Sequence, residues 1–313
     1  WSVWKEQFRH KEDELHYHQK LQQIKNAPLP DNDRTVLFKE RFQYVLQYFN
    51  QLEQEDLAIT EQDKMLYNLC RHDRLLDIMY HFVLFDDGVK KITRYQQYFA
   101  VKWTLERISK VETDGKRQGG VIWHTQGSGK SLTMVMLAQL IAMHPAIKNP
   151  RIVLITDRVD LDDQITETFK KCHKIVRQAT KGASTEAIKI FRNEDLREKE
   201  LENFKKDTSL LGYLLQSDDS IITTIVNKFE TLVSKASASF EANNIFVLVD
   251  EGHRSHYGPM GIKVKKVFPN AAFVAFTGTP LMKKEKSTAG QFGGIVPGTI
   301  YTISNAVEDK AVV

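Results

Sequence analysis

The sequence predicts an α/β fold in which a doubly wound parallel sheet, with helices on both faces, follows a mainly helical segment. Two observations predict this fold. Short apolar runs rich in β-branched residues alternate with helical patterns over the C-terminal part of the chain, as in βαβ units. In addition, a glycine-rich turn, Gly127-Ser-Gly129, joins one such run directly to a helical segment. Parallel strands joined by helices place the loops that follow the strands along one edge of the sheet.

The glycine-rich turn has the layout of a phosphate-binding loop between a strand and a helix. Glycine adopts positive φ readily, which lets successive N–H groups point at an anion. Lys130 is then expected to reach the β and γ phosphates of ATP, and the Ser131 hydroxyl to ligate Mg²⁺. The general pattern begins with glycine, whereas this chain has His124. The candidate loop residues are Thr125, Gln126, Gly127, Ser128, Gly129, Lys130 and Ser131.

A possible adenine-reading segment lies upstream of the loop. Arg94 and Gln97 in the run Arg94–Ala100 have the spacing of the adenine motif of superfamily-two helicases. A glutamine amide both donates and accepts hydrogen bonds, so Gln97 can read one edge of adenine. The alternative is that both residues are solvated on an amphipathic helix.

An acidic pair, Asp250-Glu251, follows the apolar run Ile245–Val249. Asp250 is expected to hold Mg²⁺, and Glu251 to orient or deprotonate the attacking water. With Lys130, these are the candidate catalytic residues. The alternative is a pair of acids capping a strand-to-helix turn.

A third set of residues is assigned to coupling between hydrolysis and movement. It consists of His253 and the turn after the run Ala271–Phe276, whose members are Thr277, Gly278 and Thr279. Hydroxyl and imidazole groups there are expected to exchange hydrogen bonds when the γ-phosphate is lost.

Candidate DNA contacts follow the other strands. The runs Arg151–Thr156 and Ser220–Val226 are read as buried parallel strands, with Asp160 as the N-cap of the helix after the first. The residues assigned to DNA are Thr156, Arg158, Thr224 and Lys228.

Residues 1–80 are predicted to be helical. Trp1, Trp4, Phe8, Leu15, Leu21 and Ile24 fall roughly on one face of a first helix. A second apolar pattern from Val36 to Leu52 predicts one further amphipathic helix, and Leu75–Val89 is an apolar run with a turn signal at its end. This segment carries no recognisable chemistry.

Taken together, the motifs resemble the first motor lobe of the restriction subunit of type I restriction-modification enzymes. The similarity covers roughly residue 75 to the end. The segments that carry it are Phe82–Gly88, Arg94–Ala100, Trp123–Ser131, Thr156–Gln164, Val249–Ser255, Phe276–Leu281 and Tyr301–Ile303.

The resemblance implies a RecA-like lobe of an ATP-dependent DNA translocase that uses ATP and Mg²⁺ and acts on double-stranded DNA with methylation and specificity subunits. It implies three segments: a connector (1–80), the motor lobe (81–300) and the start of a passage to a second lobe (301–313). No convincing Glu-x-Lys nuclease signature is present, and the second lobe with its arginine finger is absent from this stretch. This stretch is therefore expected neither to cut nor to translocate DNA alone.

Composition leaves the competing functions open. The formal charge of +4 permits a nucleic-acid partner without requiring one. Cys70 and Cys172 are expected to be free thiols in a reducing cytoplasm, and no run approaches a membrane span. The alternatives are another superfamily-two DNA or RNA helicase, a nucleotide-gated interaction module, and, more remotely, a small-molecule kinase.

Overall fold

The computed structural model of the 313-residue chain forms two compact units, essentially Val3–Met79 and Tyr80–Val313. We call them the helical unit and the sheet unit, and each is treated by itself. The residues described are 4–39, 42–157, 159–172, 174–185, 187–188, 209–215, 220–235, 239–250, 267–280 and 288–311.

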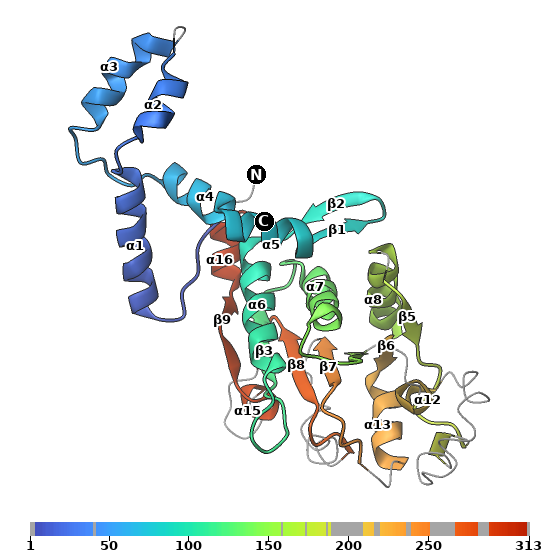
Figure 1. Cartoon of the computed structure of the whole chain (residues 1–313). Helices are drawn as coiled ribbons and strands as arrows, with labels where there is room; N and C mark the ends of the chain where they lie inside the picture. Colours follow the sequence, from blue (N-terminus) through green and yellow to red (C-terminus); the bar gives the residue numbers. More distant parts are fainter. Residues whose placement is uncertain are drawn as a thin grey trace. The chain divides into compact units, whose positions relative to one another are not determined.

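The helical unit is built from short helices, as predicted (Figure 1). They are α1 (Lys11–Lys25), α2 (Asp31–Leu37), α3 (Gln43–Leu52), α4 (Glu61–Cys70) and α5 (His72–His81), the last of which crosses the boundary between the units. The single helix expected over Val36–Leu52 is wrong, because α2 ends at Leu37 and α3 begins at Gln43. Pro30 and the acids of the next turn favour a helix start ahead of that run.

The face expected for the first helix is also partly wrong. Trp4 and Phe8 precede α1, and Leu15 and Ile24 are exposed. Leu21 is buried as expected, together with Tyr17, which the apolar pattern omits. Charged residues around Tyr17 and Leu21 make the apolar pattern of α1 weak, so its buried face is hard to identify from the sequence.

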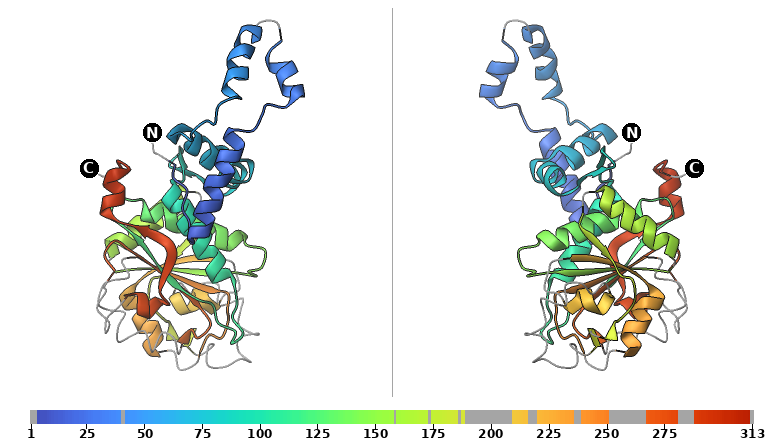
Figure 2. Two further views of the ribbon diagram at one scale, coloured as in Figure 1. Left: turned by 90° about the vertical axis from the view of Figure 1, so that its left-hand side faces the viewer. Right: turned by 90° about the vertical axis from the view of Figure 1, so that its right-hand side faces the viewer.

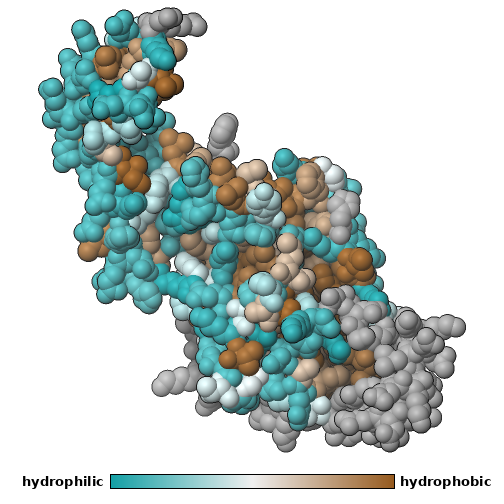
Figure 3. Space-filling view, in the orientation of Figure 1, coloured by the Kyte–Doolittle hydropathy of each residue, from teal (hydrophilic) through white to brown (hydrophobic). Residues whose placement is uncertain are grey.

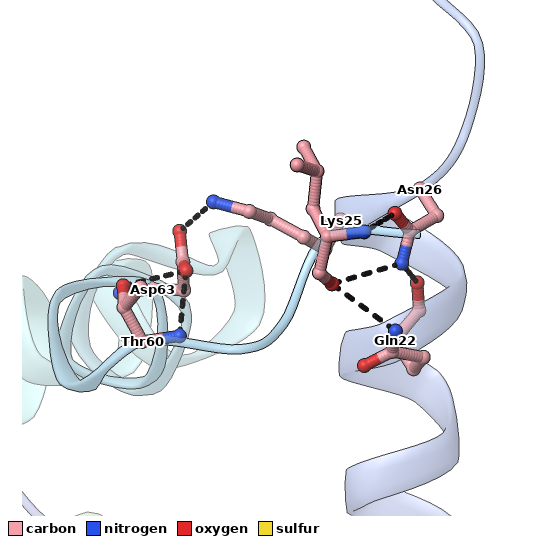
Figure 4. Close-up of polar contacts among 6 residues, drawn as sticks. Gln22, Lys25, Asn26, Thr60 and Asp63 are labelled. Carbon is pink, nitrogen blue, oxygen red and sulfur yellow. Dashed lines mark hydrogen bonds and ion pairs between the residues drawn. The ribbon is translucent and has the colours of Figure 1, made fainter. Parts of the chain in front are cut away.

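Polar contacts join α1 to α4 (Figure 4). The Lys25 ammonium lies 2.9 Å from a carboxylate oxygen of Asp63, whose other oxygen accepts from the hydroxyl and backbone N–H of Thr60. Thr60 is the N-cap of α4 and forms a capping box with Asp63. These hydrogen bonds, from Thr60 first and then Lys25, lower the pKa of Asp63 to about 2.

A buried polar cluster fills the centre of the helical unit. The Tyr17 hydroxyl donates to the Asn68 side chain at 2.7 Å. Arg74 donates to the Asn68 carbonyl at 3.2 Å and to the Glu6 carboxylate at 2.7 Å. The side chains of Arg74 and Glu6 are only 2% and 9% exposed. We call these four residues, Glu6, Tyr17, Asn68 and Arg74, the polar cluster.

By contrast, α2 and α3 have no buried residue. Apolar side chains on them face solvent, and Figure 3 shows brown residues among teal ones at this helical pair. The two helices are joined by polar contacts, with Arg34 donating to Asn50 and Glu53.

The sheet unit contains a seven-stranded sheet in which every described pairing is parallel, and this confirms the predicted α/β class. Its order is β5-β6-β4-β7-β8-β3-β9. The strands are β3 (Gly120–His124), β4 (Arg151–Thr156), β5 (Val176–Gln178), β6 (Ser220–Ile225), β7 (Ile245–Asp250), β8 (Ala272–Thr277) and β9 (Ile295–Tyr301).

Helices cover both faces of this sheet, as predicted. Figure 2 shows α6 (Tyr95–Ser109), α7 (Lys130–Met143) and α8 (Val159–Lys171) on one face. On the other face lie α12 (Leu210–Leu215) and α13 (Val226–Lys235). Two short helices, α15 (Thr288–Phe292) and α16 (Ile303–Glu308), flank β9 in the sequence. The central strands are buried on both faces, which explains their continuous apolar runs.

Three features of the structure differ from the elements predicted from the sequence or add to them. The apolar run before Gly88 forms a hairpin of β1 (Val83–Asp86) and β2 (Val89–Ile92), and positive φ at Asp87 and Gly88 fits the turn type of tight hairpins. Strands β5 and β9 extend the sheet at its two edges. The helix α8 begins at Val159, so Asp160 lies in its first turn and is not its N-cap.

Candidate nucleotide-binding site

Three neighbouring strands bring the predicted loops to one edge of the sheet. Trp123 of β3 is paired with Thr277 of β8, and Phe276 of β8 with Asp250 of β7. The carboxyl ends of these strands therefore lie side by side, where ligands bind in open parallel sheets. Of the predicted catalytic residues, Lys130 begins α7 and Asp250 ends β7, whereas Glu251 and His253 lie outside the described residues.

The phosphate loop has the backbone that its glycines predict. Gly127 and Gly129 have φ values of 79° and 85°, in the left-handed region. The Ser128 hydroxyl donates to the Thr125 carbonyl at 2.6 Å, which holds the turn closed from inside. Gly129 is the N-cap of α7, so the first N–H groups of that helix, which have no intrahelical acceptor, face the loop. This is an anion-binding arrangement.

Gln97 connects the upstream segment to this loop. Its amide oxygen accepts from the Arg94 N–H at 2.9 Å, and its amide nitrogen donates to the Gly129 carbonyl at 3.1 Å. At 4% exposure, Gln97 is not a solvated surface residue. The amide oxygen can accept one more hydrogen bond and the amide nitrogen can donate one more. Gln97 therefore keeps the groups that reading adenine would require.

The φ of 85° at Gly129 favours glycine at this position. A Cβ added there would lie 2.6 Å from the Gln97 amide nitrogen, so the Gln97 side chain would have to move. The segment Arg94–Ala100 and the glycine-rich loop therefore touch directly through Gln97 and Gly129.

The turn after β8 lies against the phosphate loop. The buried Thr277 hydroxyl accepts from the Thr279 N–H at 3.1 Å, and the Trp123 indole donates to the Gly278 carbonyl at 3.1 Å. A Cβ on Gly278 would lie 3.3 Å from the Gln126 nitrogen. Trp123 thus fixes the turn, and this role was not predicted from the sequence. The signal for this role was that Trp123 is the penultimate residue of β3, just before the loop.

His124 is fully buried beneath the loop. Neither of its ring nitrogens has a hydrogen-bond partner within the part of the chain that the structure describes. Burial, and to a lesser extent the charge of Lys130, lowers the pKa of this imidazole to about 3. The ring packs edge-on against Tyr301, with centroids 5.8 Å apart. A neutral ring at this position adds no charge beside Lys130.

Ser131 and Asp250 are the side chains that would hold Mg²⁺. No group of three or more His, Cys, Asp or Glu residues suited to a metal occurs among the described residues. Mg²⁺ keeps most of its waters and takes one or two protein ligands beside the phosphates. A hydroxyl at the start of α7 and a carboxylate at the end of β7 supply the hard oxygen donors that it prefers.

The residues assigned to DNA receive no support from their placement. Thr156 and Thr224 are fully buried, so neither offers surface to a phosphate. The Lys228 ammonium donates to the Ala179 carbonyl at 2.7 Å, within the fold. Arg158 lies outside the described residues.

Comparison with known proteins decides the family. Residues 96–313 match the model of the SWI2/SNF2 ATPases, which covers well over half of the chain. The chain belongs to the SWI2/SNF2 ATPase family. Nucleotide binding by this chain follows from that membership. None of the described helices has the length and apolar character of a membrane span.

The relatives of this ATPase include type I restriction enzyme subunits. It is 33% identical to the type I restriction enzyme HindI endonuclease subunit of Haemophilus influenzae, over 81% of this chain and 24% of that protein. It is 31% identical to the putative MjaIXP endonuclease subunit of Methanocaldococcus jannaschii, over 81% and 22%. The chain thus spans about a quarter of the length of these relatives, and it is their homologue.

Among solved structures, a nuclease-deletion mutant of the type ISP restriction-modification enzyme LlaGI, in complex with a DNA substrate mimic, is similar at a TM-score of 0.46 and 15% identity. The match covers 71% of this chain and 21% of that one.

Proposed function

We propose that this chain is the ATP-binding and ATP-hydrolysing lobe of a DNA translocase, within the DNA-cleaving subunit of a type I restriction enzyme. The observation that carries the proposal is the direct contact between Gln97 and Gly129, because it joins an adenine-reading segment to a phosphate loop. The homology to type I endonuclease subunits supplies the choice of system. In this proposal residues 81–300 are the motor lobe, residues 1–80 the connector and residues 301–313 the start of the passage to a second lobe.

The residues act mainly by placing charge. Lys130 and the N–H groups at the start of α7 neutralise the phosphates, and Gln97 reads adenine. Ser131 and Asp250 hold Mg²⁺, which would offset charge on the phosphate oxygens. Glu251 orients the attacking water. The Thr277–Thr279 turn, held by Trp123, touches the loop and is the candidate for passing on the loss of the γ-phosphate, together with His253.

Binding of ATP tests the first half of the proposal. Lys130→Ala is expected to weaken binding of ATP with Mg²⁺ by at least about 100-fold, since a charged contact to the phosphates is removed. Lys110→Ala, which removes an exposed lysine at the end of α6, is the matched control and is expected to bind normally. Isothermal titration calorimetry on both variants measures this. Equal affinities would contradict the proposal.

Hydrolysis in the presence of nucleic acids tests the second half. Duplex DNA is expected to stimulate hydrolysis more than single strands or RNA do, when the chain is assayed with the methylation and specificity subunits. Stimulation by RNA alone would favour an RNA helicase. A Glu251→Gln variant of the full-length subunit with undiminished ATP hydrolysis would favour a nucleotide-gated interaction module.

A further inference from the structure

Two buried tyrosines and one aspartate form a cluster beside the nucleotide-binding site. The Tyr95 hydroxyl donates to Asp309 Oδ2 at 2.5 Å, and the Tyr301 hydroxyl donates to the same oxygen at 3.0 Å. The two rings meet edge-on, with centroids 6.2 Å apart. Tyr95 and Tyr301 are 5% and 1% exposed. We call these three residues the tyrosine clamp.

Each tyrosine belongs to a different part of the site. Tyr95 is the first residue of α6 and lies between Arg94 and Gln97 in the adenine-reading segment. Tyr301 ends β9, and its carbonyl accepts from the N–H of Thr125 in the phosphate loop at 2.9 Å. One carboxylate oxygen therefore connects the adenine-reading segment with the phosphate loop.

The position of Asp309 is fixed by the end of α16. Asp309 is the C-cap of this helix, and Lys310 follows with φ of 53°. The Lys310 N–H donates to the Val307 carbonyl and the Ala311 N–H to the Ala306 carbonyl, which is the hydrogen-bond pattern of a Schellman motif. At the other end, Thr302 caps α16 through a capping box. The carboxylate is thus held by a helix that is capped at both ends.

The chemistry of the cluster is that of a carboxylate accepting from two phenols. Burial first, and then the hydrogen bond to Asp309, raises the pKa of both Tyr95 and Tyr301. The phenols therefore stay protonated and remain donors. Hydrogen bonds to an ionised acceptor are the stronger kind, and they are strongest when partly buried.

We propose that Asp309 is a positioning residue that, through Tyr95 and Tyr301, sets the spacing between the adenine-reading segment and the phosphate loop. This inference rests on the proposed function, because it concerns the same nucleotide. Asp309 touches neither base nor phosphate. It determines whether both halves of the site can contact one ATP molecule at once.

The test compares two ligands, ATP and inorganic triphosphate, because the second lacks the base. Asp309→Ala is expected to weaken binding of ATP about 10-fold or more, and binding of triphosphate less than about 2-fold. Glu308→Ala, which removes an exposed acid one residue away, is the matched control and is expected to change neither affinity. Asp309→Asn keeps an oxygen acceptor for the phenols and is expected to restore most of the affinity for ATP.

A general structural role would behave differently. In that case Asp309→Ala would weaken the binding of ATP and of triphosphate by the same factor, or its affinities would equal those of Glu308→Ala. Either result overturns the inference. Should Asp309→Ala fail to fold, Tyr95→Phe removes one hydroxyl and keeps the ring, and the same comparison of ligands applies to it. An unmodified chain that binds neither ligand would instead overturn the proposed function, and the inference with it.

Discussion

The helical unit and the sheet unit bury different kinds of side chain. The helical unit has the polar cluster at its centre, where Arg74 and Glu6 form a buried ion pair. The sheet unit buries strands such as β4 and β7, whose interiors are apolar on both faces. An apolar core loses stability in proportion to the volume removed, whereas a polar cluster loses it when one partner leaves another unpaired. The two units should therefore respond to different substitutions.

The largest effect is expected in the apolar core. Phe246 of β7 is fully buried and packs against the Arg117 guanidinium. Phe246→Ala is expected to lower the free energy of unfolding of the sheet unit by about 3–5 kcal/mol. Hydrogen exchange read region by region would show lost protection in β4 and β7 and none lost in α1 and α4. Phe85→Ala, at an exposed site on β1, is the control, and a similar effect there would break the comparison.

A slightly smaller effect is expected in the polar cluster. Arg74→Ala leaves the Glu6 carboxylate buried without its main partner, which costs about 3 kcal/mol. Lost exchange protection should be confined to the helical unit. Arg34→Ala breaks the more exposed ion pair with Glu53 and is expected to have a much smaller effect on stability. Equal losses in the two variants would mean that burial of the polar cluster contributes nothing.

His124 gives the sheet unit a pH dependence between pH 8 and pH 5, above the range in which Asp63 of the helical unit titrates. Its pKa is about 3 in the native state, against an ordinary value of 6.5. Below pH 6.5 the unfolded chain therefore binds a proton that the native chain does not, so stability falls as the pH drops from 6.5 towards 3. Between pH 8 and pH 5 the loss is about 2 kcal/mol.

The matched variant for this prediction is His124→Gln, which cannot titrate. Denaturant unfolding across pH 5–8 measures the difference between the two slopes, since every other group is common to both chains. Parallel curves for the two chains would show that the imidazole is accessible to protons in the native state.

The smallest effect is expected from removing a helix cap, and each unit has a comparable one. Thr60 caps α4, and Thr302 caps α16, each through a capping box. Thr60→Ala and Thr302→Ala are each expected to cost about 1 kcal/mol. Exchange protection should fall in α4 alone for the first variant and around α16 for the second. Loss that spreads through a whole unit would mean that these helices form only as part of it.

Local patterns predicted the parts of the fold that local chemistry determines. The glycines of the phosphate loop require positive φ, and the buried parallel strands are continuous apolar runs, so both could be located from the sequence. Strand β9 could not, because Pro297 and Gly298 lie inside it. Both residues argue against a central strand, and β9 tolerates them at the edge of the sheet. The hairpin turn at Asp87-Gly88 had a local signal that was read only as a turn.

Contacts between distant residues left no such signal. Tyr95 and Asp309 are 214 positions apart, and nothing near either residue indicates the other. Likewise, Thr156 and Thr224 were assigned to DNA from their place in the sequence, whereas both are fully buried. The roles assigned to Glu251, His253 and Arg158 stay predictions.

The contact between Gly129 and Gln97 constrains how this family can vary in sequence. Any side chain at position 129 would collide with the Gln97 amide, and φ of 85° would strain it as well. A side chain at position 129 would thus displace the Gln97 amide and break its hydrogen bond to the carbonyl of residue 129, so the two positions, 32 residues apart, are coupled. In this chain, Gly129→Ala is expected to displace the Gln97 amide from its place between the Arg94 N–H and residue 129.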